Sequence, residues 1–319
     1  MPLCATTNLA VTSRRDALEF VVMNEAAWRD PEWLSKAQDW VDGRLADLGV
    51  ERTGDIEQPH VRPWSTVLRV PTANGVVWFK ANAGPLRHEA AVVSLIAARR
   101  PEVVPPLLAA DVASGWMLMA DAGETLRSVV ERERSLDRWL DVLPRYAEVQ
   151  LALAGDVDDL LAFGVPDMRL ANLPAGYERL LDEINAEPRF RAAASMVADM
   201  CAELAAAGVP ELLQHDDLHD GQVFVHDGRH LIMDWADACV SHPFFTLSVT
   251  LEGQLAWGLD DVENSVDIAP FRDAYLARFP GKTIGPALRL GWVCRAINGN
   301  VGDVGQTRNR LAMFLDGHP

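Results

Sequence analysis

The chain has few cysteines, no long hydrophobic run and a shortage of basic residues. Its cysteines include no Cys-x-x-Cys pair, which argues against a structural zinc site and against a disulfide framework (Cys4, Cys201, Cys239 and Cys294). No apolar run approaches the length of a membrane span, and the N-terminus has no basic segment followed by an apolar one. We therefore expect a protein of the reducing cytoplasm that is neither anchored in a membrane nor exported.

Acidic residues outnumber basic ones, with 46 aspartates and glutamates against 29 lysines and arginines and a net charge of -17. This excess argues against nucleic acid and against an anionic membrane as partners, and it favours a cationic small molecule. With 319 residues, 49% of them hydrophobic, the chain is long enough to bury a sizeable core and to form two lobes. The composition indicates no particular oligomeric state.

The most informative stretch runs from residue 214 to residue 235 and is rich in acids and histidines. After a polar loop, two short apolar segments flank an Asp-Gly pair at residues 227–228, which predicts a hairpin. A turn centred there places Gln222 opposite Met233, so Asp217, Gln222 and Asp234 gather at the open end of the hairpin. Carboxylates that gather in this way need a cation or a shared proton, and Mg²⁺ is a cation that such oxygen ligands hold.

A lysine on a predicted strand and a glutamate on the next predicted helix both fall on apolar faces. Residues 65–70 and 75–81 predict the strands, and residues 87–99 predict the helix. Lys80 shares a strand face with Val76 and Trp78 by the two-residue period. Glu89 lies on the buried stripe of the helix, where an unpaired carboxylate would be strongly destabilising. Lys80 and Glu89 are therefore predicted to pair.

The loop and the hairpin together resemble the active site of the kinase superfamily. His215-Asp216-Asp217, with Gln222 five residues after Asp217 and Asp234 beyond the hairpin, is similar to the His-x-Asp-x-x-x-x-Asn loop and the metal-binding Asp of kinases. The sequences at residues 215–219 and 234–238 most resemble those of the aminoglycoside phosphotransferase family. Members of that family are small-molecule kinases with the protein-kinase fold. The resemblance is specific over residues 212–247 and looser elsewhere.

This resemblance implies an α+β, protein-kinase-like fold with two lobes. Residues 1–120 would form a small N-terminal nucleotide-binding lobe, with an antiparallel sheet and a helix. Residues 121–319 would form a larger, mostly helical C-terminal lobe that carries the catalytic loop and the substrate site. The strand predicted at residues 116–120 would lead into the hinge between the lobes, where the backbone of Met119 and Ala120 would contact adenine.

The resemblance also implies ATP and Mg²⁺ as cofactors and assigns a role to each site residue. Asp217 would accept the proton of the substrate hydroxyl, and Gln222 and Asp234 would hold Mg²⁺. Lys80 would contact the α- and β-phosphates, and Glu89 would position Lys80. The implied activity is transfer of the γ-phosphoryl of ATP to a hydroxyl of a small, cationic metabolite or an aminoglycoside-like antibiotic. The sequence does not identify that acceptor.

Three positions depart from the pattern of the family. Gln222 stands where the family usually has Asn, and its amide oxygen is carried on a side chain one methylene longer. Asp216 stands where the family has Gly and adds an acid to the site. The segment at residues 241–247 lacks the acids that the family tends to have there, so the catalytic loop must be braced by other groups.

These departures leave two other functions open. Gln222, His242 and Thr246 are compatible with a nucleotide-binding protein of kinase fold that has weak or no catalysis. The second is a metal-dependent phosphohydrolase that uses the acids and histidines of the loop as ligands (His215, Asp216, Asp217, His219 and Asp220). That reading leaves Lys80, Glu89 and Asp234 without a role.

The remainder of the C-terminal part is predicted to be mostly helical, over residues 136–153, 173–187, 189–207, 245–256, 269–279 and 286–298. Two acidic groups lie between these segments. One comprises Asp156, Asp158 and Asp159, and the other comprises Asp260, Asp261 and Glu263. Each is either a solvated turn or a set of carboxylates that recognises a cationic acceptor.

Overall fold

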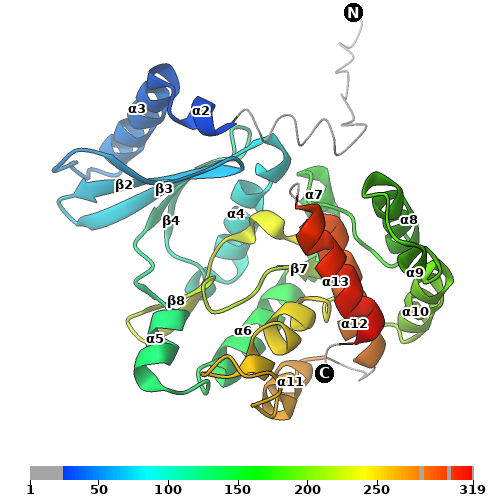
Figure 1. Cartoon of the computed structure of the whole chain (residues 1–319). Coiled ribbons are helices and arrows are strands. Elements are labelled where there is room, and N and C mark those ends of the chain that lie inside the picture. The colour runs from blue at the N-terminus through cyan, green and yellow to red at the C-terminus, as the bar shows by residue number, and fades with distance from the viewer. Residues whose placement is uncertain (1–23, 280–283, 300–302, 318–319) are drawn as a thin grey trace, which may run out of the picture.

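The computed structural model describes residues 24–279, 284–299 and 303–317, which form a sheet lobe and a helical lobe (Figure 1). The sheet is antiparallel, with strand order β1-β2-β3-β5-β4. Its strands are β1 (Glu57–Arg62), β2 (Ser65–Thr72), β3 (Gly75–Asn82), β4 (Leu107–Asp111) and β5 (Trp116–Ala120). The two strands predicted from residues 65–81 are thus confirmed as β2 and β3, and the α+β architecture is confirmed with them.

One face of the sheet is covered by helix α3 (Pro31–Asp47), which follows the short helix α2 (Asn24–Trp28). Alternate residues of β2 and β3, such as Leu68 and Phe79, are buried against the apolar stripe of α3. Asp30 caps this helix by accepting from the amides of its first turn. Because this face is sealed, the opposite face, which carries Lys80, is the one turned toward the rest of the site.

Helix α4 (Glu89–Arg99) joins the two lobes. Ala90, Val92, Val93 and Ile96 of this helix belong to the same hydrophobic core as the helical lobe, and that core also includes Met117 and Met119 of β5. The hydrophobic core of the helical lobe therefore continues onto the inner face of the sheet. This continuity fixes Lys80 and Glu89 relative to the catalytic loop.

The helical lobe contains most of the helices and two small sheets. The helices are α5 (Leu126–Glu133), α6 (Trp139–Ala152), α7 (Val157–Ala162), α8 (Leu173–Glu183), α9 (Pro188–Arg191), α10 (Ala194–Ala206), α11 (Ala269–Leu276), α12 (Gly285–Asn298) and α13 (Val304–Asp316). β7 (Leu212–Gln214) pairs with β10 (Cys239–Ser241). β8 (Val223–His226) pairs with β9 (Arg229–Ile232) and with β6 (Glu124–Thr125). Among the described residues, no helix has the length and apolar character needed to cross a membrane.

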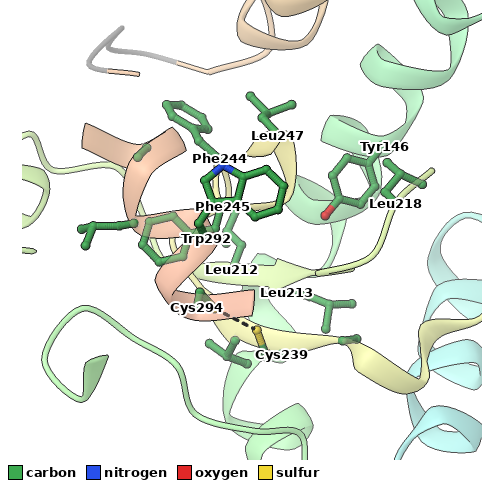
Figure 2. Packing of buried hydrophobic residues seen from close by; sticks show 14 of the residues in the cluster. Tyr146, Leu212, Leu213, Leu218, Cys239, Phe244, Phe245, Leu247, Trp292 and Cys294 are labelled. Carbon is green, nitrogen blue, oxygen red and sulfur yellow. Dashed lines mark hydrogen bonds between the residues drawn. The ribbon is translucent and has the colours of Figure 1, made fainter. Parts of the chain in front are cut away.

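Aromatic residues pack beneath the catalytic loop, between α6, α12 and the segment that follows β10 (Figure 2). Gly291 allows α12 to approach that segment, because a Cβ atom there would overlap Ser248 and the Phe245 carbonyl. Cys239 and Cys294 lie in the same core as free thiols, with their sulfur atoms 3.9 Å apart. Cys4 lies outside the described residues. The small size of Gly291 therefore lets α12 pack closely against the segment that supports the loop.

Apart from differences of a few residues at their ends, the predicted helices differ from the structure in two places. The helix predicted at 189–207 is interrupted after α9, and α10 begins at Ala194. The predicted helix at 245–256 is a π-helical turn (Ser248–Glu252) followed by a 3-10 turn (Leu255–Trp257). The hydroxyls of Ser248 and Thr250 donate to the carbonyls of Leu288 and Leu218, so this segment is held by contacts outside itself rather than by a regular helical ladder.

A buried histidine near this segment predicts a loss of stability in acid. His242 is fully buried, which lowers its pKa to about 4. Between that value and about 6.5, the unfolded chain binds a proton that the folded chain does not. The free energy of unfolding should therefore decrease as the pH is lowered, by up to about 1.4 kcal/mol per pH unit. Denaturant unfolding of the wild type and of His242→Asn between pH 7.5 and 4.5 measures this contribution.

The His242→Asn variant should show a shallower dependence of stability on pH across this window, whatever its stability at pH 7.5. His226→Asn is the matched control, because His226 is partly exposed, and it should keep the slope of the wild type. Parallel curves for the wild type and His242→Asn would contradict the prediction.

Candidate active site

The hairpin of β8 and β9 places its flanking polar residues as predicted. Its register pairs His226 with Arg229, and the Met233 amide donates to the Gln222 carbonyl over 2.8 Å. The side chains of Gln222 and Asp234 meet at the open end, where Gln222 Nε2 lies 3.3 Å from Asp234 Oδ2. The predicted pairing of Gln222 with Met233 is confirmed, and it brings an amide and a carboxylate to one point.

Lys80 connects the sheet lobe to this hairpin. Its Nζ lies 2.8 Å from Glu89 Oε1 and 2.7 Å from Asp234 Oδ1. Burial opposes the charge on Lys80, but the carboxylates of Asp234 and Glu89 outweigh that effect and raise its pKa. The predicted pairing of Lys80 with Glu89 is therefore present, and Asp234 joins it as a second partner.

The two carboxylates around Lys80 differ in their environment. Burial raises the pKa of Glu89 despite the attraction of Lys80, and Asn82 donates to the second oxygen of Glu89. Burial also opposes ionisation of Asp234, but there Lys80 prevails and lowers the pKa. Asp234 has a φ of 59°, in the left-handed region, and such strain often marks a functional position.

The His215 side chain connects the catalytic loop to the end of strand β9. Its Nε2 lies 2.8 Å from the Met233 carbonyl, and its Nδ1 accepts from the Asp217 amide over 3.3 Å. Burial lowers the pKa of His215, and the neutral ring packs against Trp235. The loop and the end of the hairpin are thus tied together through one neutral imidazole.

A threonine and a tyrosine hold the loop where the family pattern predicted acids. The Asp216 amide donates to Thr246 Oγ1 over 3.1 Å, and the Tyr146 hydroxyl donates to the same oxygen over 3.0 Å. The Tyr146 hydroxyl in turn accepts from the His215 amide over 2.8 Å. Neutral hydroxyls therefore perform the bracing that the sequence showed must be done by other groups.

Sequence reasoning missed Arg295 on α12, which is buried among three carboxylates of the site. It forms ion pairs with Asp216, Asp217 and Asp237. A signal was present, because Arg295 falls within the apolar residues of the helix predicted at 286–298. A charged residue at a buried helical position is the same signal that identified Glu89.

Strand β5, at the position predicted to lead into the hinge, places Met119 opposite Trp78 of β3 and Ala120 opposite Val77. Met119 is buried, and the Ala120 amide donates to the Pro106 carbonyl over 3.0 Å. That amide is therefore already engaged within the sheet lobe. Trp78 lies on the Lys80 face of β3 and donates its indole N–H to Asp121 just beyond β5.

A pocket of about 680 Å³ lies beside the catalytic loop, between α5 and the segment 249–261. His219 and Asp220 of the loop form part of its wall. Of the acidic groups singled out in the sequence, Asp261 lines this pocket, and Asp260 pairs with Arg134 at its edge. Asp156 does not line this pocket, and its carboxylate pairs with Arg99 of α4.

Two sets of residues have the chemistry to hold a metal ion. Gln222 and Asp234 offer oxygen atoms at the end of the hairpin beside Lys80, which fits Mg²⁺ in the company of phosphate oxygens. Asp216, Cys239 and Cys294 also lie within reach of one ion. Two of the three ligands in the second set are cysteine sulfurs, which suit softer metals than Mg²⁺, so the first set is the stronger candidate for Mg²⁺.

A strand lysine paired with a helix glutamate, together with a loop aspartate and a hairpin carboxylate, is the arrangement that kinases use around ATP. The chain belongs to the phosphotransferase enzyme family known as APH, whose sequence profile matches residues 58–283. The resemblance seen in the catalytic motifs is thereby confirmed. The comparison with curated proteins found no match.

Solved structures share this fold at low sequence identity. A choline kinase from Streptococcus pneumoniae is 11% identical with a TM-score of 0.57, and the match covers 88% of this chain and 98% of that one. A macrolide 2'-phosphotransferase from Brachybacterium faecium is 17% identical with a TM-score of 0.51, over 87% and 98%. A thermostable mutant of the aminoglycoside phosphotransferase APH(4)-Ia is 16% identical with a TM-score of 0.53, over 85% and 97%.

Proposed function

We propose that the protein transfers the γ-phosphoryl of ATP to a hydroxyl of a small amine-bearing molecule. The observation that carries this proposal is Lys80, held between Glu89 and Asp234 at the point where the two lobes meet. A buried lysine with a carboxylate on either side is suited to receive phosphate oxygens next to a metal ion. In this proposal residues 1–120 form the nucleotide-binding lobe and residues 121–319 form the lobe of the acceptor.

The reaction follows from the positions of five side chains. Asp217 accepts the proton of the acceptor hydroxyl while the hydroxyl oxygen forms a bond to Pγ. The bond between Pγ and the oxygen that bridges it to Pβ breaks, which releases ADP. Lys80 stabilises the phosphate charge, and Glu89 keeps Lys80 in place. Gln222 and Asp234 would hold Mg²⁺, which neutralises the triphosphate when bound.

The lining of the pocket beside the catalytic loop supports an acceptor that is partly apolar and positively charged. Val130, Val249 and Leu259 provide apolar wall. The two arginines of the lining are each neutralised, Arg127 by Asp220 and Arg134 by Asp260. Glu131 and Asp261 form no ion pair with any residue that the structure describes, so the lining favours an ammonium group.

A nucleotide-binding protein without effective catalysis is the second candidate. Both oxygens of Asp234 are engaged, one by Lys80 and the other by the Gln222 amide nitrogen. Metal binding must displace the Gln222 contact or turn its amide so that the oxygen faces the ion. If that rearrangement is costly, affinity for Mg²⁺ is low and turnover is slow.

ATP with Mg²⁺ is expected to raise the melting temperature of the purified protein, because a ligand that binds only the folded state stabilises it. Asp234→Ala should remove the part of the shift that depends on Mg²⁺. Substrate-dependent ADP release, screened with amino alcohols, amino sugars and aminoglycosides, then tests the acceptor class.

The same assay with neutral polyols and sugar acids is the control for charge. An absent shift with millimolar ATP and Mg²⁺ would refute the proposed donor. A shift without ADP release from any hydroxyl compound would favour the second candidate.

A further inference from the structure

Arg295 is the most enclosed cation near the catalytic loop, with only 6% of its surface exposed. Its Nη2 lies 2.7 Å from Asp217 Oδ1. Its Nη1 lies 2.8 Å from Asp237 Oδ2 and 3.4 Å from Asp216 Oδ2. One guanidinium therefore serves three carboxylates, one of which is the proposed base.

These acids come from two different segments, and α12 joins them. Asp216 and Asp217 lie in the loop after β7, whereas Asp237 ends the 3-10 turn (Trp235–Asp237) that follows Asp234. Asn298, one turn after Arg295, donates to Asp216 Oδ2 over 2.9 Å and to the Asp237 carbonyl over 2.6 Å. The last turn of α12 therefore connects the loop that carries Asp217 to the segment that follows Asp234.

The contact with Asp217 engages one of its two oxygens. An aspartate carboxylate otherwise turns about a broad, two-fold torsion, so either oxygen can face a substrate. With Oδ1 held by Arg295, Oδ2 is the oxygen left for the acceptor hydroxyl. His219 Nε2 lies 3.9 Å from this Oδ2, which is beyond hydrogen-bond distance.

On the basis of the proposed function, we propose that Arg295 is a positioning residue that fixes Asp217 through Oδ1, so that Oδ2 receives the proton of the acceptor hydroxyl. Asp216 and Asp237 hold Arg295 in the orientation that this contact requires. The proposal also explains why an acid stands at position 216, where the family pattern has Gly. A buried guanidinium has five N–H donors, and Asp217 alone satisfies too few of them.

The local backbone conformation explains why an aspartate is tolerated at position 216. Its φ of 67° lies in the left-handed region, which Asp adopts more readily than most residues other than Gly. Its side chain is enclosed, and burial raises its pKa against the opposing effects of Arg295 and Asn298. Asp216 therefore depends on Arg295, because without that guanidinium its buried carboxylate would lose its ion pair.

The experiment is a double-mutant cycle between Arg295 and Asp217, with ATP·Mg²⁺ as the nucleotide and water as the acceptor. Arg295→Met leaves three acids without a cation and is at risk of unfolding, so Arg295→Lys, which keeps the charge but has a single donor group, is the main variant. Release of ADP is followed at steady state over a range of ATP concentrations for the wild type, Arg295→Lys, Asp217→Asn and the double variant. Melting temperatures confirm that all four are folded.

Arg295→Lys is expected to lower kcat about tenfold or more while the KM for ATP changes less than about threefold. In the Asp217→Asn background it should cause no further loss of kcat, because a residue that acts through Asp217 has nothing left to position. An equal loss in both backgrounds would show a general structural effect and overturn the proposal. An unchanged kcat in Arg295→Lys would overturn it as well.

Arg289→Lys is the matched control on the same helix. The Arg289 guanidinium bonds the Phe314 and Leu315 carbonyls, away from the three acids. Its kcat should stay within about twofold of the wild type, and a loss equal to that of Arg295→Lys would attribute both to loosening of α12, against the proposal. A wild type that neither binds ATP·Mg²⁺ nor releases ADP refutes the proposed function and this inference together. A wild type that turns over while the cycle is additive refutes the inference alone.

Discussion

Asp217→Asn is expected to abolish most of the turnover while leaving the affinity for ATP nearly unchanged. The substitution keeps the size of the side chain and removes the group that accepts the hydroxyl proton, which typically contributes a factor of roughly 10² to 10⁴ in rate. The Arg295 guanidinium would still meet the amide oxygen, so the loop should remain folded. Steady-state rates with an acceptor found by screening, together with an ATP·Mg²⁺ binding curve, measure the two effects separately.

The control for this variant is Asp158→Asn, on helix α7, where the residue is no part of the proposed site. It should leave both rate and affinity as in the wild type. If Asp217→Asn retained turnover within about threefold of the wild type, Asp217 would not be the base. A parallel loss of ATP affinity would point instead to collapse of the metal site.

Lys80→Met is expected to reduce both stability and nucleotide binding. Without the ammonium, Glu89 becomes an unpaired carboxylate that is 1% exposed, and breaking a buried pair of this kind costs about 3 to 5 kcal/mol. Loss of a cation aimed at transferring phosphate should also lower turnover by about 10² or more. Urea unfolding and the ATP·Mg²⁺ thermal shift report the two losses independently.

Glu89→Gln in the Lys80→Met background distinguishes these effects. The amide needs no counterion and can still accept from Asn82, so it should restore part of the lost stability. Nucleotide binding should not return, because the phosphate contact remains absent. Recovery of ATP affinity in the double variant would show that Lys80 serves the fold alone.

The hairpin and the Lys80–Glu89 pair were predictable because each is encoded over a short stretch of chain. An Asp-Gly turn fixes which residues of β8 and β9 face each other, and so it brings Gln222 and Asp234 together. The helical stripe of α4 places Glu89 inside, where only a nearby cation makes it tolerable. In both cases the pattern and its partner lie within about twenty residues.

The brace of the catalytic loop was beyond sequence reasoning for the opposite reason. Thr246 and Tyr146 meet the Asp216 and His215 amides only after α6 and the segment following β10 have packed together. Tyr146 is 69 residues from His215, and a tyrosine on an apolar helix gives no hint of its hydrogen-bond partner. The missing regular helix at 245–256 has the same origin, since its hydroxyls bond distant carbonyls.

The cluster around Arg295 has a consequence for the order in which the protein is made. During synthesis, Asp216, Asp217 and Asp237 leave the ribosome well before α12, which supplies their cation. Until then the emerging chain carries three acids that repel one another, and this repulsion opposes the hydrogen bonds to Tyr146 and Thr246 that hold the catalytic loop against the core. A nascent chain that ends before α12 should therefore remain sensitive to protease at residues 215–237, and protection should appear only once Arg295 and Asn298 have emerged.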